Sequence, residues 1–233
     1  MIGLIALSIA VIVAGIVLAH AFRDVKKRRD TITVTGSARE PITANQASWR
    51  LTVRAQKKSS ADASRLLRRE VRTVRAFLRD GGLAGEDLTL PPIAIDQIQR
   101  RIGRKRFVTD YLLTQSFHIT TGEVQKLEAT AGNVSDLLER GVTLTVGQLS
   151  YSSTELTEAR LKALQAATGN ASERAKTIVE GVGGHLGGVR RASVGVYQIV
   201  PRNSNEISDY GINDTSTKEK DVVAVVSVTF GVD

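Results

Sequence analysis

Few residues of the chain could carry acid–base or metal chemistry, and they lie far apart in the sequence. The histidines are His20, His118 and His185, and the chain has no cysteine. A zinc site needs two histidines spaced by one helical turn or a paired set of thiolates, and the sequence contains neither pattern. We expect His118 to be a hydrogen-bonded side chain on the polar face of a strand. The sequence therefore predicts no metal site and no catalytic histidine.

A glycine-rich run from Gly181 to Gly188 (GVGGHLGG) looks like a phosphate-binding loop at first sight. Such a loop follows a strand and opens a helix, because the helix N-terminus holds the anion. Here the run ends a helical pattern and leads into a strand, so we expect it to cap the helix. No Gly-x-Ser-x-Gly, Walker or His-Glu-x-x-His motif is present, and Glu155, Glu158 and Glu173 have the spacing of solvated helix positions. We therefore predict a protein that is not an enzyme and has no cofactor.

Clustered positive charge is the feature most able to bind a ligand. The chain has 32 Lys and Arg residues against 24 Asp and Glu residues, a formal net charge of +8 at pH 7. Clusters of this kind attract phosphates and anionic lipid headgroups. The candidate contacts follow the N-terminal apolar segment or form a basic turn between two strands: Arg23, Lys26, Lys27, Arg28, Arg29, Arg100, Arg101, Arg104, Lys105 and Arg106.

A further basic cluster follows one face of a predicted helix, with arginine at positions 65, 68, 69, 72, 75 and 79. A solvated helix face and a solvated hairpin tip are the alternatives to a binding role for these clusters. Aromatic residues do not alternate with the arginines, as a site for single-stranded nucleic acid would require. We therefore favour a solvated role for these basic residues. Where they do bind a ligand, we expect anionic lipid or another polyanion, with nucleic acid disfavoured.

The N-terminal segment predicts a membrane anchor. Residues 2–22 carry no formal charge over 21 positions, which as a helix spans roughly 30 Å, the thickness of a bilayer core. A cleaved signal peptide is the alternative, since Ala19-His20-Ala21 resembles a cleavage site, but a basic n-region is missing and the apolar stretch is too long. We predict a transmembrane helix over residues 1–22 and a basic juxtamembrane linker over residues 23–30.

The remaining residues predict one two-layer α/β domain of the α+β type over residues 31–233, with helices packed on one face of a mixed sheet. Leu88–Ile98 is expected to be an edge or broken strand, because Pro91-Pro92 removes two backbone donors. Residues 201–220 read as a long surface loop. Strands are expected at 31–36, 46–56, 107–120, 142–151, 189–200 and 221–230, and helices at 60–80, 123–140 and 154–182.

The order of these segments resembles the SIMPL-domain (DUF541) family. TITVTGSAREPITANQASWRLTV is similar to the opening of that family, and Trp49 fits its membrane-anchored branch. The chain departs from the family in its arginine content and in its Thr-Gly-Ser turn. Later segments that continue the resemblance over about residues 31–230 are VRAFLRDGGLAGEDLTL, FVTDYLLTQSFHITT, LLERGVTLTVGQLSYSSTEL and ALQAATGNASERAKTIVEGVGGHLGGVRRASVGVYQI.

The resemblance implies a domain outside the cytoplasm, periplasmic or at the cell surface in bacteria, with no catalytic residues to carry over. Some members of the family form large ring-like homo-oligomers. The basic flank after the apolar segment conflicts with this topology, because positive charge usually stays on the cytoplasmic side. We follow the family and expect a single-pass cell-envelope scaffold that forms a homo-oligomer. The alternative is a cytoplasm-facing basic module that binds nucleic acid or anionic lipid.

Overall fold

The computed structural model describes residue 15, residues 30–102 and residues 106–233. The predicted anchor and linker fall almost entirely outside this part. No helix within the described residues is long and apolar enough to cross a membrane. The described chain divides into two compact units. Unit 1 contains the residues up to Ile42, Leu156–Asn213 and Asp221–Asp233, and unit 2 contains Thr43–Glu155 and Asp214–Lys220.

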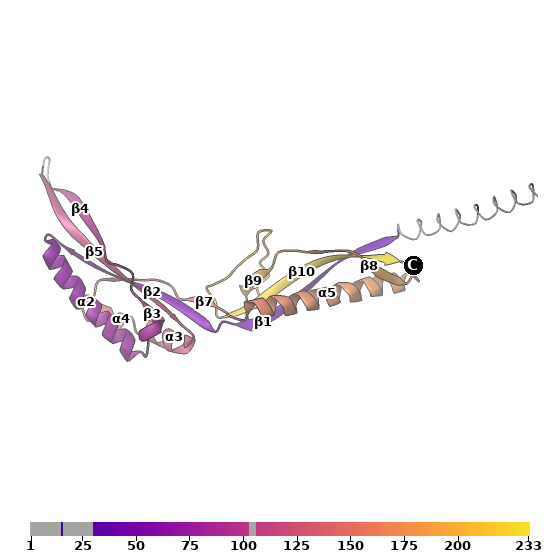
Figure 1. Cartoon of the computed structure of the whole chain (residues 1–233), viewed down its shortest axis with the longest axis horizontal. Helices are drawn as coiled ribbons and strands as arrows, with labels where there is room; N and C mark the ends of the chain where they lie inside the picture. Colours follow the sequence, from indigo (N-terminus) through magenta and orange to yellow (C-terminus); the bar gives the residue numbers. More distant parts are fainter. Residues whose placement is uncertain (1–14, 16–29, 103–105) are drawn as a thin grey trace, which may run out of the picture. The chain divides into compact units, whose positions relative to one another are not determined.

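Unit 2 is an antiparallel sheet with helices on one face (Figure 1). The central strand β2 pairs with β5 from Ala47 opposite Thr121 to Lys57 opposite Tyr111. The strands of unit 2 are β2 (Gln46–Lys57), β3 (Leu88–Thr89), β4 (Ala94–Ile102), β5 (Arg106–Thr121), β6 (Leu144–Val146) and β7 (Ser150–Ser152). Its helices are α2 (Ser60–Asp80), the short 3-10 helix η1 (Gly85–Asp87), α3 (Val124–Gly132) and α4 (Ser135–Glu139).

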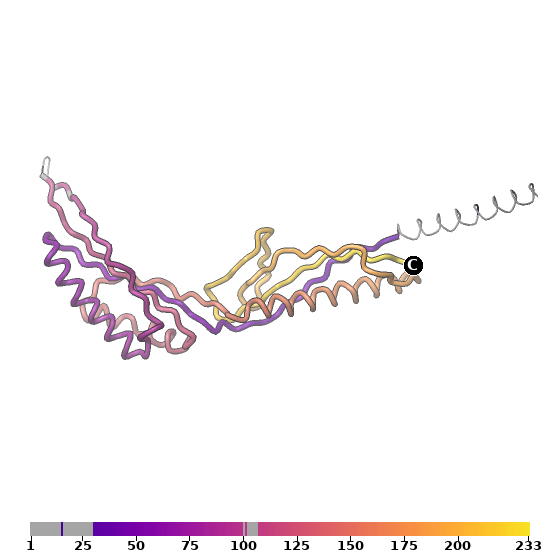
Figure 2. The backbone as a smooth tube through the Cα atoms, viewed as in Figure 1, coloured from indigo at the N-terminus to yellow at the C-terminus, as the bar shows by residue number. Residues whose placement is uncertain are grey.

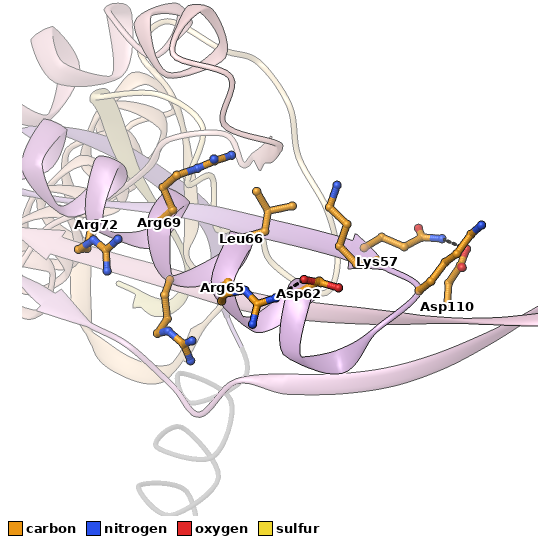
Figure 3. Close-up of a pocket in the computed structure, with 10 residues that line it drawn as sticks. Lys57, Asp62, Arg65, Leu66, Arg69, Arg72 and Asp110 are labelled. Carbon is orange, nitrogen blue, oxygen red and sulfur yellow. Dashed lines mark hydrogen bonds and ion pairs between the residues drawn. The ribbon is translucent and has the colours of Figure 1, made fainter.

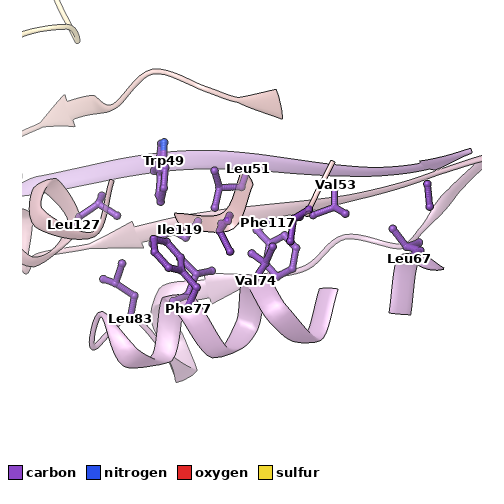
Figure 4. Packing of buried hydrophobic residues seen from close by; sticks show 14 of the residues in the cluster. Trp49, Leu51, Val53, Leu67, Val74, Phe77, Leu83, Phe117, Ile119 and Leu127 are labelled. Carbon is purple, nitrogen blue, oxygen red and sulfur yellow. The ribbon is translucent and has the colours of Figure 1, made fainter. Parts of the chain in front are cut away.

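The core of unit 2 forms where α2 packs against β2 and β5 (Figure 4). Alternate residues of β2 from Ala47 to Ala55 are buried, as the period of two in the sequence predicted. Phe117 of β5 and Val74 of α2 are fully buried in the same cluster. Burial of each large apolar side chain contributes roughly 1.5–3 kcal/mol, so this contact holds the helix on the sheet.

Glycines end the helices of unit 2 at defined positions. Gly82 has a φ of 76°, and the hydrogen bonds from Gly82 N to Arg79 O and from Leu83 N to Leu78 O form a Schellman motif. Gly141 ends α4 in the same way, with Val142 N bonded to Leu137 O. The helix expected over residues 123–140 is instead two helices, because bonds from residues 133 and 134 reach back only three residues and close α3.

Unit 1 is a second sheet covered by one long helix. Its elements are β1 (Thr31–Thr43), α5 (Leu156–Gly181), β8 (Leu186–Val194), β9 (Gln198–Pro201) and β10 (Glu219–Val232), of which Thr43, Glu219 and Lys220 are counted with unit 2. The sheet order is β1-β10-β8, and β9 also pairs with β10. β8 runs antiparallel to β10. Val232 N bonds to Asp30 O and Thr33 contacts Thr229, so β1 also runs antiparallel to β10.

The prediction of one mixed sheet is therefore wrong, while the α+β composition is confirmed. Two sheets form because β1 pairs with β10 from the end of the chain and not with the adjacent β2. The strands expected at 142–151 and 189–200 are each divided in two, and β1 extends seven residues past the expected Gly36 to Thr43. The predicted interruption at Pro91-Pro92 is confirmed, since β3 ends before it and β4 begins after it.

A stripe of alanines lets α5 lie close to the sheet of unit 1. Buried alanines recur every four residues from Ala159 to Ala175 along α5. Gly36 of β1 lies against them, and a Cβ atom built on Gly36 would stand 2.2 Å from Ala167 O and 2.7 Å from Ala171 Cβ. No side chain fits at this position without moving the helix.

Gly36→Ala should therefore destabilise the protein, because an inserted methyl group in a packed contact typically costs about 1–3 kcal/mol. Gly169→Ala is the matched control. Gly169 lies in α5 itself, with nothing within 4 Å of its added Cβ, so we expect this change to stabilise the protein by about 0.5–1 kcal/mol. Thermal unfolding followed by circular dichroism measures both effects. Equal stability of the two variants would contradict the close approach.

Candidate functional site

The outer face of α2 is a continuous arginine surface, which we define as Arg65, Arg68, Arg69, Arg72, Arg75 and Arg79. All six side chains are exposed, whereas Ala63, Leu67 and Val74 on the opposite face are buried. Spacings of three, four and seven residues bring side chains together on one side of a helix. The arginine surface therefore concentrates positive charge along most of the helix.

A cleft lies at the N-terminal end of the arginine surface. Its volume is about 1010 Å³, and Lys57 and Lys58 from the end of β2 join four of the arginines around it (Figure 3). Asp62 pairs with Arg65, and Asp110 accepts a hydrogen bond from Gln56 Nε2 at 2.9 Å. Six cationic side chains thus face two carboxylates, each already engaged by a neighbour. This excess of positive charge gives the cleft a potential that favours anions.

Glu70 lies buried below the arginine surface, with an exposed fraction of 3%. Burial raises the pKa of its carboxyl group, and the backbone N–H of Thr143 and the charges of Arg69 and Lys57 lower it in part. The distance from Thr143 N to Glu70 Oε2 is 3.4 Å. Because this carboxyl group is buried, it is not among the side chains that line the cleft.

The predicted lipid contacts lie mostly outside the described residues. This holds for Arg23, Lys26, Lys27, Arg28 and Arg29, and also for Arg104 and Lys105. Arg100 lies near the end of β4 and Arg106 begins β5, and of both residues only the backbone is described. Arg101 has an exposed side chain and pairs with Phe107 across the hairpin. The structure therefore does not test whether the basic turn binds lipid.

The sequence prediction left Lys57 and Lys58 out of the basic clusters. They directly precede the helix that carries the arginines, and this adjacency was the available signal. What the sequence could not give is the position of Asp110 from β5 at the same cleft, because that position depends on pairing between strands β2 and β5.

The β4–β5 hairpin is a second candidate surface (Figure 2). The described side chains of β4, Ala94–Gln99 and Arg101, are all exposed, so neither face of this strand is covered. The exposed fractions are 65% for Ile95, 63% for Phe107 and 46% for Ile93. Within the described residues β4 pairs with β5 alone, which leaves its other edge open. Exposed apolar side chains beside an open edge are typical of a contact surface.

Of the histidines in the described part of the chain, His118 lies in unit 2 and His185 in unit 1. His118 lies on the polar face of β5 opposite Arg50, as expected, in a shallow pocket of about 410 Å³. His185 is exposed, and its backbone bonds to Asp233. The glycine run around it caps α5 as predicted, with Gly184 N bonded to Val179 O. No group of three acidic or histidine side chains suited to a metal ion occurs among the described residues.

Comparison with known families finds one match that covers most of the chain. The model of the SIMPL family, described as a protein of unknown function (DUF541), matches residues 32–230. No curated protein matches the chain. Among solved structures, a proposed aminohydrolase from methicillin resistant Staphylococcus aureus is similar at 16% identity, over 60% of this chain and 38% of that chain. Its TM-score of 0.26 is too low to support any argument about fold or activity.

Glu70→Gln should stabilise unit 2 at pH 7, because it removes a charge that burial disfavours. The raised pKa means that folding favours the neutral acid, so the penalty is present above the folded pKa and disappears below the ordinary value of 4.5. We expect the melting temperature of Glu70→Gln to exceed that of the parent by a few degrees at pH 7 and to equal it near pH 4.

Glu86→Gln is the control, since Glu86 is exposed and the same change should leave the melting temperature unaltered. A lower melting temperature of Glu70→Gln at pH 7 would mean that the contacts with Thr143, Arg69 and Lys57 outweigh burial.

Proposed function

The chain belongs to the SIMPL (DUF541) family, and from that membership we propose a non-enzymatic, membrane-anchored protein that self-associates as a scaffold of the cell envelope. Its folded part lies outside the cytoplasm, in the periplasm or at the cell surface. Residues 2–22 act as the single membrane anchor, because they carry no charge over a length that spans a bilayer core. With this anchor, the protein is a member of the membrane-anchored branch of the family.

Self-association is supported most directly by the open edge of β4. A strand edge presents unpaired N–H and C=O groups, and natural proteins usually protect such edges with charge, proline or a covering element. Here Ile93, Ile95 and Phe107 stand exposed beside the edge instead. A second copy of the chain that added its own strand would bury these side chains and complete the hydrogen bonds. Isologous contacts of this kind generate closed dimers.

β8 offers a similar edge in unit 1. It pairs with β10 on one side within the described residues, and Val189 and Val194 have exposed fractions of 61% and 51%. A chain with two distinct adhesive edges can assemble beyond a dimer, because each edge can engage a different copy. This is the arrangement expected of a scaffold.

The alternative function is a cytoplasm-facing module that binds nucleic acid or anionic lipid. The arginine surface and its cleft favour a polyanion of some kind. The basic linker that follows the anchor favours the cytoplasmic side for the folded part. The two functions differ in topology, which can be measured directly.

Ile95→Lys should weaken self-association of the full-length protein in mild detergent. Burial of an isoleucine contributes roughly 1.5–3 kcal/mol, so the dissociation constant should rise about tenfold or more. Leu161→Lys on α5 is the matched control, because Leu161 has a similar exposed fraction, 55% against 65%. Light scattering coupled to size exclusion gives the mass of the parent protein and of each variant. A monomeric mass of the unaltered protein would refute the scaffold function.

Protease added outside intact spheroplasts should digest the folded part while the anchor stays in the membrane fraction after an alkaline wash. The expected fragments begin after the exposed basic residues that a trypsin-like enzyme cleaves. Lysed spheroplasts serve as the control for protease access. Protection until lysis would reverse the topology and favour the cytoplasmic alternative.

A further inference from the structure

We propose that the arginine surface of α2 and the cleft at its end bind a linear phosphodiester polymer. This goes beyond the proposed function, because it assigns a ligand to a surface that self-association through β4 does not use. The ligand is defined by its chemistry: one negative phosphate per repeating unit, on a flexible chain without bases.

The charges on α2 oppose one another in the unliganded protein. Arg65 neighbours Arg68 and Arg69, and Arg72 neighbours Arg68, Arg69 and Arg75, at spacings of three or four residues where like charges destabilise a helix. Among the described residues, Asp62 is the acid that pairs with any of the six. The charge of Glu70 also interacts with that of Arg69, but Glu70 is buried and does not reach the arginine surface. A bound anion would remove this repulsion.

The residue type points to phosphate. α2 carries six arginines and no lysine. The guanidinium group donates two parallel hydrogen bonds to one phosphate, whereas the ammonium group of lysine acts as a point charge. Arg68 Nη1 donates to Ser64 Oγ at 2.7 Å, and its guanidinium group carries further N–H donors beyond this one. A row of forked donors recognises a row of phosphates.

The geometry points to a linear ligand. Arg65, Arg72 and Arg79 follow one another at intervals of seven residues, so they lie in a line about 21 Å long on an α-helix with a rise of about 1.5 Å per residue. The cleft formed with Lys57 and Lys58 terminates this line at its N-terminal end. A chain of phosphates can follow the helix and place its last phosphate in the cleft.

Two other polyanions fit less well. A helix that inserts between lipids exposes an apolar face, but the apolar face of α2 is buried in the core and Leu66 at the cleft is partly buried. Single-stranded nucleic acid binds through bases stacked on aromatic rings, but Phe77, the aromatic residue of α2, is 7% exposed. The arginine surface offers charge and hydrogen bonds without either feature.

The test uses the full-length protein in mild detergent and a fluorescently labelled oligo(glycerol phosphate) as probe. Fluorescence anisotropy should show saturable binding that weakens as salt rises, because phosphate contacts release counterions. The double variant Arg69→Gln/Arg72→Gln should bind at least about tenfold more weakly. Lys162→Gln/Lys176→Gln, which removes the same charge from exposed positions of α5, should bind within about twofold of the parent.

Arg72→Lys adds a variant that keeps the charge and the fold. Loss of affinity in this variant supports phosphate recognition by the guanidinium group, and unchanged affinity overturns it. Equal loss in the α2 and α5 double variants would overturn the site. Unlabelled competitors test the ligand class: tighter binding of phosphatidylglycerol vesicles or of a single-stranded oligonucleotide than of the polymer would overturn the phosphodiester assignment. The oligomeric mass, measured in the same samples, reports on the scaffold function separately.

Discussion

The close approach of α5 to β1 is the constraint on which unit 1 depends. Gly36 touches the backbone of α5 at Ala167 and Ala171, so the distance between helix and strand is fixed by the absence of side chains. Buried residues repeat every four positions, while an α-helix has 3.6 residues per turn, so each step rotates the stripe by about 40°. A repeat longer than 3.6 winds around the helix in the right-handed sense. The buried stripe therefore winds around α5 as it crosses the sheet, and its small side chains allow the close approach of β1 at Gly36.

In unit 2, large side chains fill the space between helix α2 and the sheet, and the outer face of α2 is free to carry charge. Leu51, Phe117 and Val74 fill the space between α2 and the sheet, so the helix is held by its inner face alone. Its outer face can then collect arginines at a cost in repulsion that the core offsets. The binding surface and the core occupy opposite sides of one helix, and a change on one side leaves the other side in place.

Local patterns predicted the elements well, and pairing between distant segments escaped them. The bounds of α2 and the alternation in β2 follow from periods of 3.6 and 2 within one segment. The pairing of β1 with β10 joins residues almost 200 positions apart, and neither strand contains a sequence pattern that identifies the other as its partner. For the same reason the arginine run was visible in the sequence, while Asp110 at its cleft was not. The predicted anchor and most of the basic lipid contacts lie outside the described residues and stay predictions.

Buried charges at the start of β10 hold the long loop before it in a defined conformation. Lys220 has an exposed fraction of 2% and bonds to Asp214 Oδ2 at 3.1 Å. The neighbouring Asp221 lies 3.5 Å from Arg202 Nε and accepts a hydrogen bond from Asn203 N. Burial alone would raise the pKa of Asp214, but hydrogen bonds from Ser216, Thr217 and Lys220 lower it well below its usual range. A carboxyl group whose pKa is lowered by folding stabilises the fold at pH values above its unfolded pKa of about 3.9. This stabilisation is lost only below that pH. The hydrogen bonds of Asp214 therefore hold the loop at every pH above about 4, well into the mildly acidic range.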